Sequence, residues 1–284
     1  TMTYLKTFFL MFLLILLFAY AGFFIGGEAG MTFALMFALI GNITAFWYSD
    51  KLILKIYSAK LISKVDYPEL NEIVFDLCST TQVPKPAIYL IEEETPNAFA
   101  TGRNPDNAAI AVTSGLVKIL DKNELKGVLA HELAHIINRD ILISTISAVF
   151  AAAITSIAYM AMFFGQRGVG RSAHPVFSLL IIFLAPLAAS VIQLAVSRSR
   201  EFEADRVGGI ISENPAALAS ALNKIEKNAK NGSFEKLENH PETAQMMIIP
   251  SMSKKGFTNL FSTHPSTEER ILRLKKLEHE LNSK

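Results

Sequence analysis

Residues 121–164 read DKNELKGVLAHELAHIINRDILISTISAVFAAAITSIAYMAMFF, and this stretch joins two kinds of helix. Asp121 followed three positions later by Glu124 is a capping-box pair, which predicts an amphipathic helix through Asn138. From Ile141 to Phe164 there is no charged residue over 24 positions, enough to cross about 30 Å of hydrocarbon. The stretch therefore predicts a water-exposed helix that leads directly into a membrane span.

Three further uncharged apolar runs indicate the same class of protein: Phe8–Ile25, Met31–Tyr48 and Val176–Ala195. Charged residues make up only 19% of the chain, against about 25% in soluble domains. A signal peptide is the alternative for the first run, but no small-residue cleavage site ends it and the second run follows at once. Buried core helices are the alternative for the other runs, but four such runs are hard to bury in 284 residues. We therefore expect four transmembrane helices.

The basic residues that flank these runs predict the orientation. Four spans put both termini on one side, and that side carries Lys6, Lys51, Lys55, Lys60, Lys64, Arg139, Arg198 and Arg200. The opposite side has Arg167 and Arg171, which weaken the bias without reversing it. By the positive-inside rule, the termini and the polar segments are expected to be cytoplasmic, in a multi-pass protein of the bacterial inner membrane.

The spans also divide the chain. The expected parts are a transmembrane hairpin (4–48), a first half of a cytoplasmic catalytic domain (49–140), a second hairpin (141–196) and a second half of the domain (197–284). Within the polar parts, helices are expected at 67–82, from 214 and from 266, and short strands at 86–91 and 108–113. Residues 232–256 have no clear period and predict a long loop. The fold class is thus an α+β integral membrane protein whose mainly helical domain carries a small β-sheet.

The net charge and the cysteine content limit which ligands and partners can be expected. The formal net charge is +1, so no nucleic-acid-binding field is expected. A single cysteine, Cys78, lies in an apolar helical pattern and can build neither an intramolecular disulfide nor a thiolate metal cage. Any metal must therefore be held by histidine and carboxylate side chains.

The residues suited to catalysis are concentrated in the helix expected at 121–138. His131 and His135 are separated by four positions and share one face of that helix, so both imidazoles can bind one Zn²⁺. Glu132 lies beside the first histidine, where it can take a proton from a water that the zinc has acidified. Chance is the alternative, but such a pentad arises only about once in a hundred chains of this composition. The pattern predicts metal-assisted hydrolysis.

A catalytic zinc site has a third protein ligand, and the segment after the fourth apolar run offers candidates. Glu201 and Asp205 are four positions apart and share a helix face, whereas Glu203 points about 200° away from Glu201. We expect Glu201 to bind zinc and Asp205 to orient a ligand histidine from behind. The alternative, a solvated charge run, describes Arg198, Arg200, Glu203 and Arg206 but leaves this spacing unexplained.

Together, these motifs resemble those of the M48 metallopeptidases, and the full set resembles the bacterial HtpX branch of that family. The resemblance rests on His131–His135 with Asn138 and Asp140, on Glu201–Asp205, on Asn97–Gly102 and on His264-Pro265. It implies a gluzincin-like zinc endopeptidase in the inner membrane, acting on the cytoplasmic face in the quality control of membrane proteins. It also implies that Asn138 and Asp140, like Asp205, lie beside the zinc ligands and orient them. It also implies that CAAX prenyl proteases are relatives, so processing of specific C-terminal substrates stays an alternative.

The remaining site residues are expected to contact substrate. The strand containing Asn97, Ala98, Phe99 and Ala100 is expected to pair with an extended peptide, or else to be an ordinary strand of the sheet. His264 is expected to donate to the oxyanion with help from Arg270, or else His264 completes a turn and Arg270 pairs with a carboxylate. The apolar group Met246, Met247, Ile248, Ile249 and Met252 contacts substrate or membrane, or packs on the domain.

The expected partners follow from these assignments: one Zn²⁺ per chain, unfolded or membrane protein substrates, the lipid bilayer and other membrane quality-control proteases. Two other classes of protein are less consistent with the sequence. A transporter or channel places ionisable residues within its spans, and the four apolar runs contain none. A non-catalytic zinc-containing scaffold would not need the base Glu132.

Overall fold

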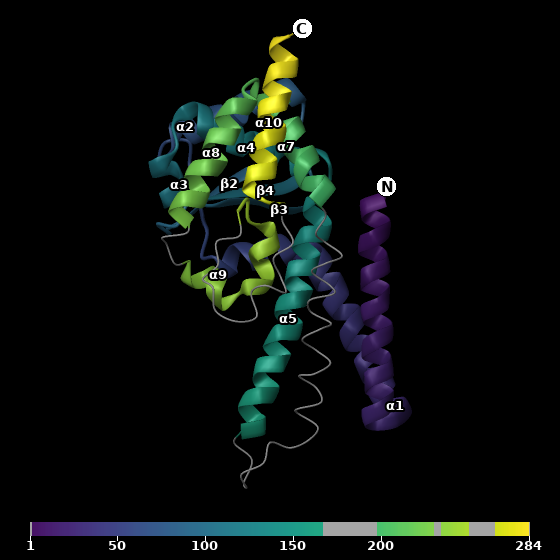
Figure 1. The fold of residues 1–284 in the computed structure, drawn as a ribbon. Helices are drawn as coiled ribbons and strands as arrows, with labels where there is room; N and C mark the ends of the chain where they lie inside the picture. Colours follow the sequence, from purple (N-terminus) through teal and green to yellow (C-terminus); the bar gives the residue numbers. More distant parts are fainter. Residues whose placement is uncertain (1, 167–197, 230–233, 250–264, 284) are drawn as a thin grey trace.

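The computed structural model describes residues 2–166, 198–229, 234–249 and 265–283 (Figure 1). Helix α1 (Met2–Ile56) folds back on itself as two antiparallel arms. The helical geometry breaks at Gly26 and Gly27, and Gly27 has a φ of 59°. The arms contact each other through the stacked rings of Phe8 and Phe46, with centroids 6.4 Å apart. The two arms correspond to the first two apolar runs, and their assignment as a transmembrane hairpin stays a prediction.

The described residues contain only some of the four transmembrane helices that the sequence predicts. Within these residues, Gly26–Ile56 is the one helix that is long and apolar enough by itself to cross a membrane. Helix α5 (Ile141–Gln166) qualifies only together with α4 (Lys122–Ile137), from which it is bent by 89°. The run Val176–Ala195 lies outside the described residues. A mainly helical chain with one clear apolar helix near its N-terminus is thus shown, and four spans stay a prediction.

A four-stranded sheet forms the base of the site, in the order β1-β2-β4-β3. Strand β1 (Lys60–Leu61) is antiparallel to β2 (Ala87–Ile91), β2 is parallel to β4 (Asn107–Thr113), and β4 is antiparallel to β3 (Ala98–Asn104). The predicted strands at 86–91 and 108–113 are confirmed, and β3 continues past the motif Asn97–Gly102 to Asn104. Gly102 has a φ of 143°, and an added Cβ would lie 2.3 Å from the carbonyl oxygen of Asn107, so only glycine allows this close hairpin.

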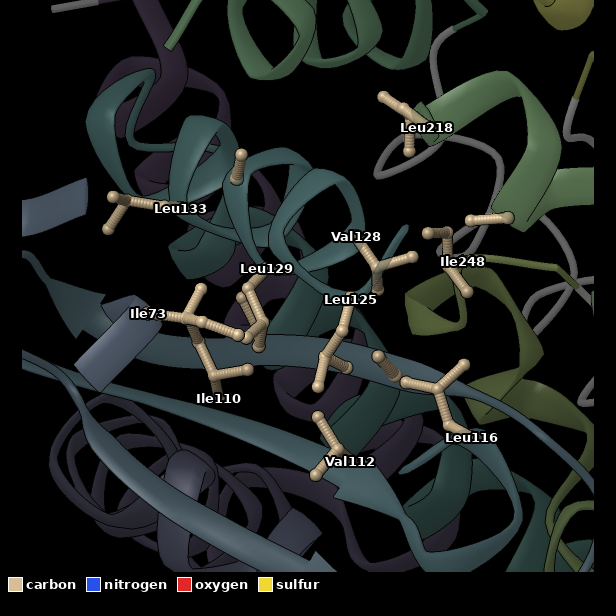
Figure 2. Close-up of a cluster of buried hydrophobic side chains, with 14 of the residues drawn as sticks. Ile73, Ile110, Val112, Leu116, Leu125, Val128, Leu129, Leu133, Leu218 and Ile248 are labelled. Atoms are coloured by element: carbon tan, nitrogen blue, oxygen red, sulfur yellow. The ribbon is translucent and has the colours of Figure 1, made fainter. Parts of the chain in front are cut away.

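Alternating side chains of the sheet bury two apolar layers. Ile110 and Val112 of β4 face α4, whose Leu125, Val128 and Leu129 cover them (Figure 2). The helices α2 (Pro68–Thr81), α8 (Pro215–Ala229) and α10 (Thr267–Asn282) contribute to the same layer. On the opposite face, Phe99 packs against Tyr57 and its ring centroid lies 5.3 Å from that of the tyrosine. The period of two in β4 is therefore what places α4 on one side of the sheet.

Caps define where the helices begin, as predicted. The Asp121 side chain accepts hydrogen bonds from the N–H groups of Asn123 and Glu124, and Glu124 completes the capping box. Glu124 is buried and also accepts from Ser220 (2.7 Å) and Lys224 (2.6 Å) of α8. The start of α4 is thereby tied to a helix about a hundred residues away. The described chain also contains α3 (Ser114–Ile119) and α7 (Arg198–Ser212).

The prediction of a long loop at 232–256 is wrong for part of this segment. A short helix α9 (Glu235–Asn239) and a 3₁₀ helix η1 (Pro241–Met246) occur there, followed by buried residues up to Ile249. Phe234 and Leu237 join the apolar layer around Tyr57, and the tyrosine hydroxyl hydrogen-bonds to Thr243. The described part of the segment takes its structure from burial against residues that are distant in sequence. The local sequence pattern of the segment does not reveal these contacts.

Candidate metal centre

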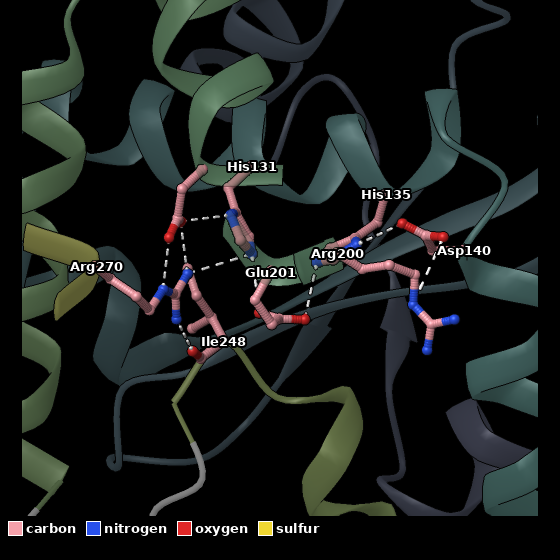
Figure 3. A network of polar contacts seen from close by, with 8 residues as sticks. His131, His135, Asp140, Arg200, Glu201, Ile248 and Arg270 are labelled. Atoms are coloured by element: carbon pink, nitrogen blue, oxygen red, sulfur yellow. Dashed lines mark hydrogen bonds and ion pairs between the residues drawn. The ribbon is translucent and has the colours of Figure 1, made fainter. Parts of the chain in front are cut away.

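Three predicted ligands converge on one point between α4 and α7 (Figure 3). Nε2 of His131 lies 3.8 Å from Oε2 of Glu201, and Nε2 of His135 lies 3.5 Å from Oε1 of the same carboxylate. One ligand atom of each residue lies within 4.8 Å of the others. Ligands about 2.0–2.1 Å from a tetrahedral zinc are about 3.3 Å apart, so two imidazoles and one carboxylate fit this ion.

The four-residue spacing places both imidazoles on one face of α4, and a glycine lets α7 reach them. An added Cβ on Gly208 would lie 2.8 Å from the Cα and N atoms of His131. The backbones of the two helices are therefore in direct contact beside the first histidine. Gly208 was not among the predicted site residues. Its signal was the pair Gly208-Gly209 inside a helical pattern, which is unfavourable for a helix unless a close approach requires it.

Carboxylates hold the far side of each imidazole. Nδ1 of His131 lies 3.0 Å from Oδ1 of Asp205, and Nδ1 of His135 lies 3.5 Å from Oδ2 of Asp140. This leaves both Nε2 atoms pointing toward Glu201, the arrangement by which outer carboxylates orient metal-binding histidines. Asp205 and Asp140 therefore lie beside the two histidines, and the orienting roles expected of both carboxylates stay predictions.

Asn138, Glu203 and Arg200 are close in sequence to the candidate ligands, and each has different contacts. Asn138 is the C-cap of α4, and its backbone N–H donates to the carbonyl of Ala134; its expected part in the site stays a prediction. Glu203 is exposed and binds Arg206 of its own helix, as its helix face predicts. Arg200, which was grouped with the solvated charges, is largely buried, with Nε 3.7 Å from Asp140. The sequence pattern gave no sign of this contact.

Arg270 is buried beside His131, with only 1% of its surface exposed, and one of its terminal nitrogens lies 3.5 Å from Nε2 of that histidine. Its Nε and one terminal nitrogen donate to the two oxygens of Asp205, at 2.8 and 2.7 Å, and the other terminal nitrogen donates to the carbonyl of Ile248 at 2.7 Å. Burial opposes both charges, but the facing pair outweighs it, lowering the pKa of Asp205 and raising that of Arg270. Arg270 thus pairs with the carboxylate that contacts His131, and its predicted effect on the transition state stays a prediction.

Burial also sets the protonation of the helix that carries the motif. It raises the pKa of Glu132 to about 7, with His135 opposing and Glu201 adding to the shift. The carboxylate accepts a hydrogen bond from the backbone N–H of Ala100 on β3. Burial lowers the pKa of His131, which favours the neutral imidazole that binds a metal. A carboxylate with a pKa near 7 is suited to general acid–base work.

The pKa of His135 is shifted in the opposite direction from that of His131. Burial alone lowers it, but Glu201, Asp140 and Glu132 together raise it to about 9. Nε2 of His135 therefore lies in a strongly negative field. The same field favours a metal cation at the point where the three candidate ligands meet.

The expected substrate strand lies beside this site. Ala100 lines the same small cavity as the three candidate ligands and Glu132. The side chain of Asn97 donates to the carbonyl of Ile249 at 2.8 Å, and the carbonyl of Ala98 accepts from the N–H of Ile248 at 3.0 Å. Phe99 points to the opposite face of the sheet. Binding of a substrate by this strand stays a prediction, and His264 lies outside the described residues.

Two histidines on one helix, a glutamate from a second helix and a buried glutamate beside the first histidine define a metallopeptidase site of the HExxH class. Comparison with known proteins agrees: residues 65–278 match the model of peptidase family M48, and the chain belongs to this family. Proteins named "Protease HtpX homolog" are similar over nearly their whole length. The one from Methylibium petroleiphilum is 53% identical, covering 95% of each chain, and that from Ralstonia pickettii is 51% identical, covering 96% of each.

Among solved structures, the crystal structure of Ste24p from S. mikatae has a similar fold, with a TM-score of 0.50 and 20% sequence identity. The match covers 92% of this chain, which spans about 62% of the length of that one. This likeness supports the fold alone. The family and its close relatives make the protein a membrane-bound metalloprotease.

Proposed function

We propose that this protein is a zinc endopeptidase that hydrolyses misfolded or damaged membrane proteins and unfolded proteins at the cytoplasmic face of the bacterial inner membrane. The observation that carries the proposal is the meeting of His131, His135 and Glu201 around the buried Glu132. The names of the relatives support proteolysis, and the apolar α1 supports a substrate source within or beside the bilayer.

His131, His135 and Glu201 are the residues that would hold the ion. Zinc bound there would supply a Lewis acid that polarises the scissile carbonyl and makes a water more acidic. Glu132 then takes the proton from the attacking water and delivers it to the leaving amine, for which a pKa of about 7 is favourable. Asp205 and Asp140 keep the two imidazoles in one orientation while this happens. The edge of β3 is proposed to hold the peptide in an extended form.

We further propose four spans, with both termini and the site cytoplasmic and with the domain boundaries given above. Only three residues separate the end of α4 from the start of α5, so the metal centre would lie close to the membrane surface. A reporter fused after Lys284 should be cytoplasmic, and one inserted at Gly168 should be external. An external C-terminus would contradict the orientation.

Neither of the two alternative functions is favoured. A CAAX-type processing enzyme and a non-catalytic scaffold both remain less consistent with relatives that are named HtpX proteases at about 50% identity. The buried Glu132, held by the backbone of β3, also has no evident use in a scaffold.

The decisive experiment removes the base and keeps the ligands. Glu132→Gln should retain about one zinc per chain and lose cleavage of unfolded casein in detergent, because the amide keeps the shape of the side chain but cannot take a proton. Glu203→Gln, on the exposed face of α7, is the matched control and should keep both zinc and activity. Near wild-type cleavage by the Glu132 variant would contradict the mechanism.

A further inference from the structure

The free edge of β3 is occupied by the protein's own chain. Strand β3 stands at the end of the sheet order, and the segment Met247–Ile249 lies against it. The N–H of Ile248 donates to the carbonyl of Ala98, and the carbonyl of Ile249 accepts from the side chain of Asn97. One backbone hydrogen bond and one side-chain hydrogen bond thus join the segment to the edge that an added peptide would use.

A third hydrogen bond ties this segment to the metal centre. The carbonyl of Ile248 accepts from Arg270, whose remaining nitrogens bind Asp205, and Asp205 contacts His131 (Figure 3). Both backbone groups of Ile248 are therefore bound, one by the strand and one by the side chain that supports a candidate metal ligand. An extended substrate at this edge would need the same partners.

The side chains of the segment fill the space beside the site. Ile248 is 2% exposed and packs in the apolar layer of α4 and α8, near Val128 and Leu218 (Figure 2). Met247, only 1% exposed, packs on the other layer with Phe99. The cavity left between Gln245–Ile248 and the three candidate ligands is about 30 Å³. This space holds about one water molecule, whereas ligand pockets measure about 300–1,000 Å³.

We infer that Met247–Ile249 is an internal pseudosubstrate, which occupies the place of a substrate on β3 and keeps the metal centre closed until it is displaced. The inference rests on the proposed function. It also specifies the substrate: the residue that replaces Ile248 enters an apolar pocket, so peptides with a large aliphatic side chain at that position are preferred. Because only molecules with a displaced segment bind substrate, the apparent activity is reduced in proportion to their fraction.

The first test weakens the segment at its apolar contact. Ile248→Asp and the milder Ile248→Ala should each raise kcat/KM for unfolded casein about tenfold or more, with zinc content unchanged. The matched control is Leu272→Asp, which places the same charge on an exposed position of α10 and should behave as the wild type. If the aspartate variant loses zinc or its thermal transition, the alanine variant decides the outcome. Equal rates for the wild type and a zinc-loaded Ile248 variant would overturn the inference.

The second test supplies the segment from outside. The blocked pentapeptide Gln-Met-Met-Ile-Ile should inhibit Ile248→Ala competitively, and the same peptide with aspartate in place of the first isoleucine should not. Equal effects of the two peptides would overturn the inference. The two levels of failure are distinguishable: zinc-loaded wild type and variants that all fail to cleave casein contradict the proposed function, whereas cleavage that neither variant nor peptide alters contradicts only the pseudosubstrate.

Discussion

Replacement of Gly208 by alanine should separate the two helices that form the metal centre. The new Cβ would lie 2.8 Å from the Cα and N atoms of His131, about 0.6 Å short of ordinary van der Waals contact. Both neighbours are backbone atoms of a buried helix and cannot rotate away, so α7 has to move. Overpacking of this kind costs about 1–3 kcal/mol, against about 1 kcal/mol gained from the better helix propensity of alanine.

The effect on the metal should exceed the effect on stability. Glu201 is carried by α7 and both histidines by α4, so the movement changes the distances between the ligands. Metal–ligand distances tolerate only about 0.2 Å of error. We expect zinc affinity to fall on the order of 10–100-fold, similar to the loss of a residue that orients a ligand. Competition with a chromophoric chelator measures this affinity.

The neighbouring Gly209 offers a matched control. Its added Cβ would lie 3.1 Å from the end of the Leu277 side chain, which can move, and 3.2 Å from Cβ of Pro215. Gly209→Ala should therefore keep zinc affinity close to that of the wild type. Wild-type affinity in Gly208→Ala, or equal losses in both variants, would refute the claim that Gly208 sets the approach of α7 to the site.

Three further predictions follow from burial and partners. Arg270→Leu removes the partner of the buried Asp205 carboxylate and should lower the free energy of unfolding, measured by thermal unfolding, by about 3–5 kcal/mol. Arg273→Leu loses an exposed ion pair on the same helix and should lower it by at most about 1 kcal/mol. Glu201→Ala should lose zinc in metal analysis and Glu203→Ala should retain it; equal losses would contradict the face assignment. Burial raises the pKa of Cys78 to about 11, so about one molecule in a thousand carries the thiolate at pH 8. A thiol reagent should therefore react with Cys78 only after the protein unfolds. Rapid labelling of the folded protein would contradict this burial.

Much of the site could be predicted because the residues of its first helix are close together in sequence. The capping box at Asp121 and the shared face of His131 and His135 depend on residues three or four positions apart, where helix geometry alone decides the outcome. The same holds for the strands, whose alternating pattern is set by neighbours in sequence. The roles expected of Glu201 and Asp205 followed from the spacing within one further helix. Both side chains lie beside His131, and the roles themselves stay predictions.

The sequence by itself determined the caps, the helix faces, the strands and the apolar runs, because each can be recognised from the order of neighbouring residues. The tertiary structure alone decided that Arg270 binds both Asp205 and Ile248, that Gly208 brings two backbones into contact, and that Ile248 lies on β3. Ile248 and its partner Ala98 are 150 positions apart, and the segment around Ile248 has no period of its own. Its place is set by burial and by hydrogen-bond partners that exist only once the sheet and α10 have come together.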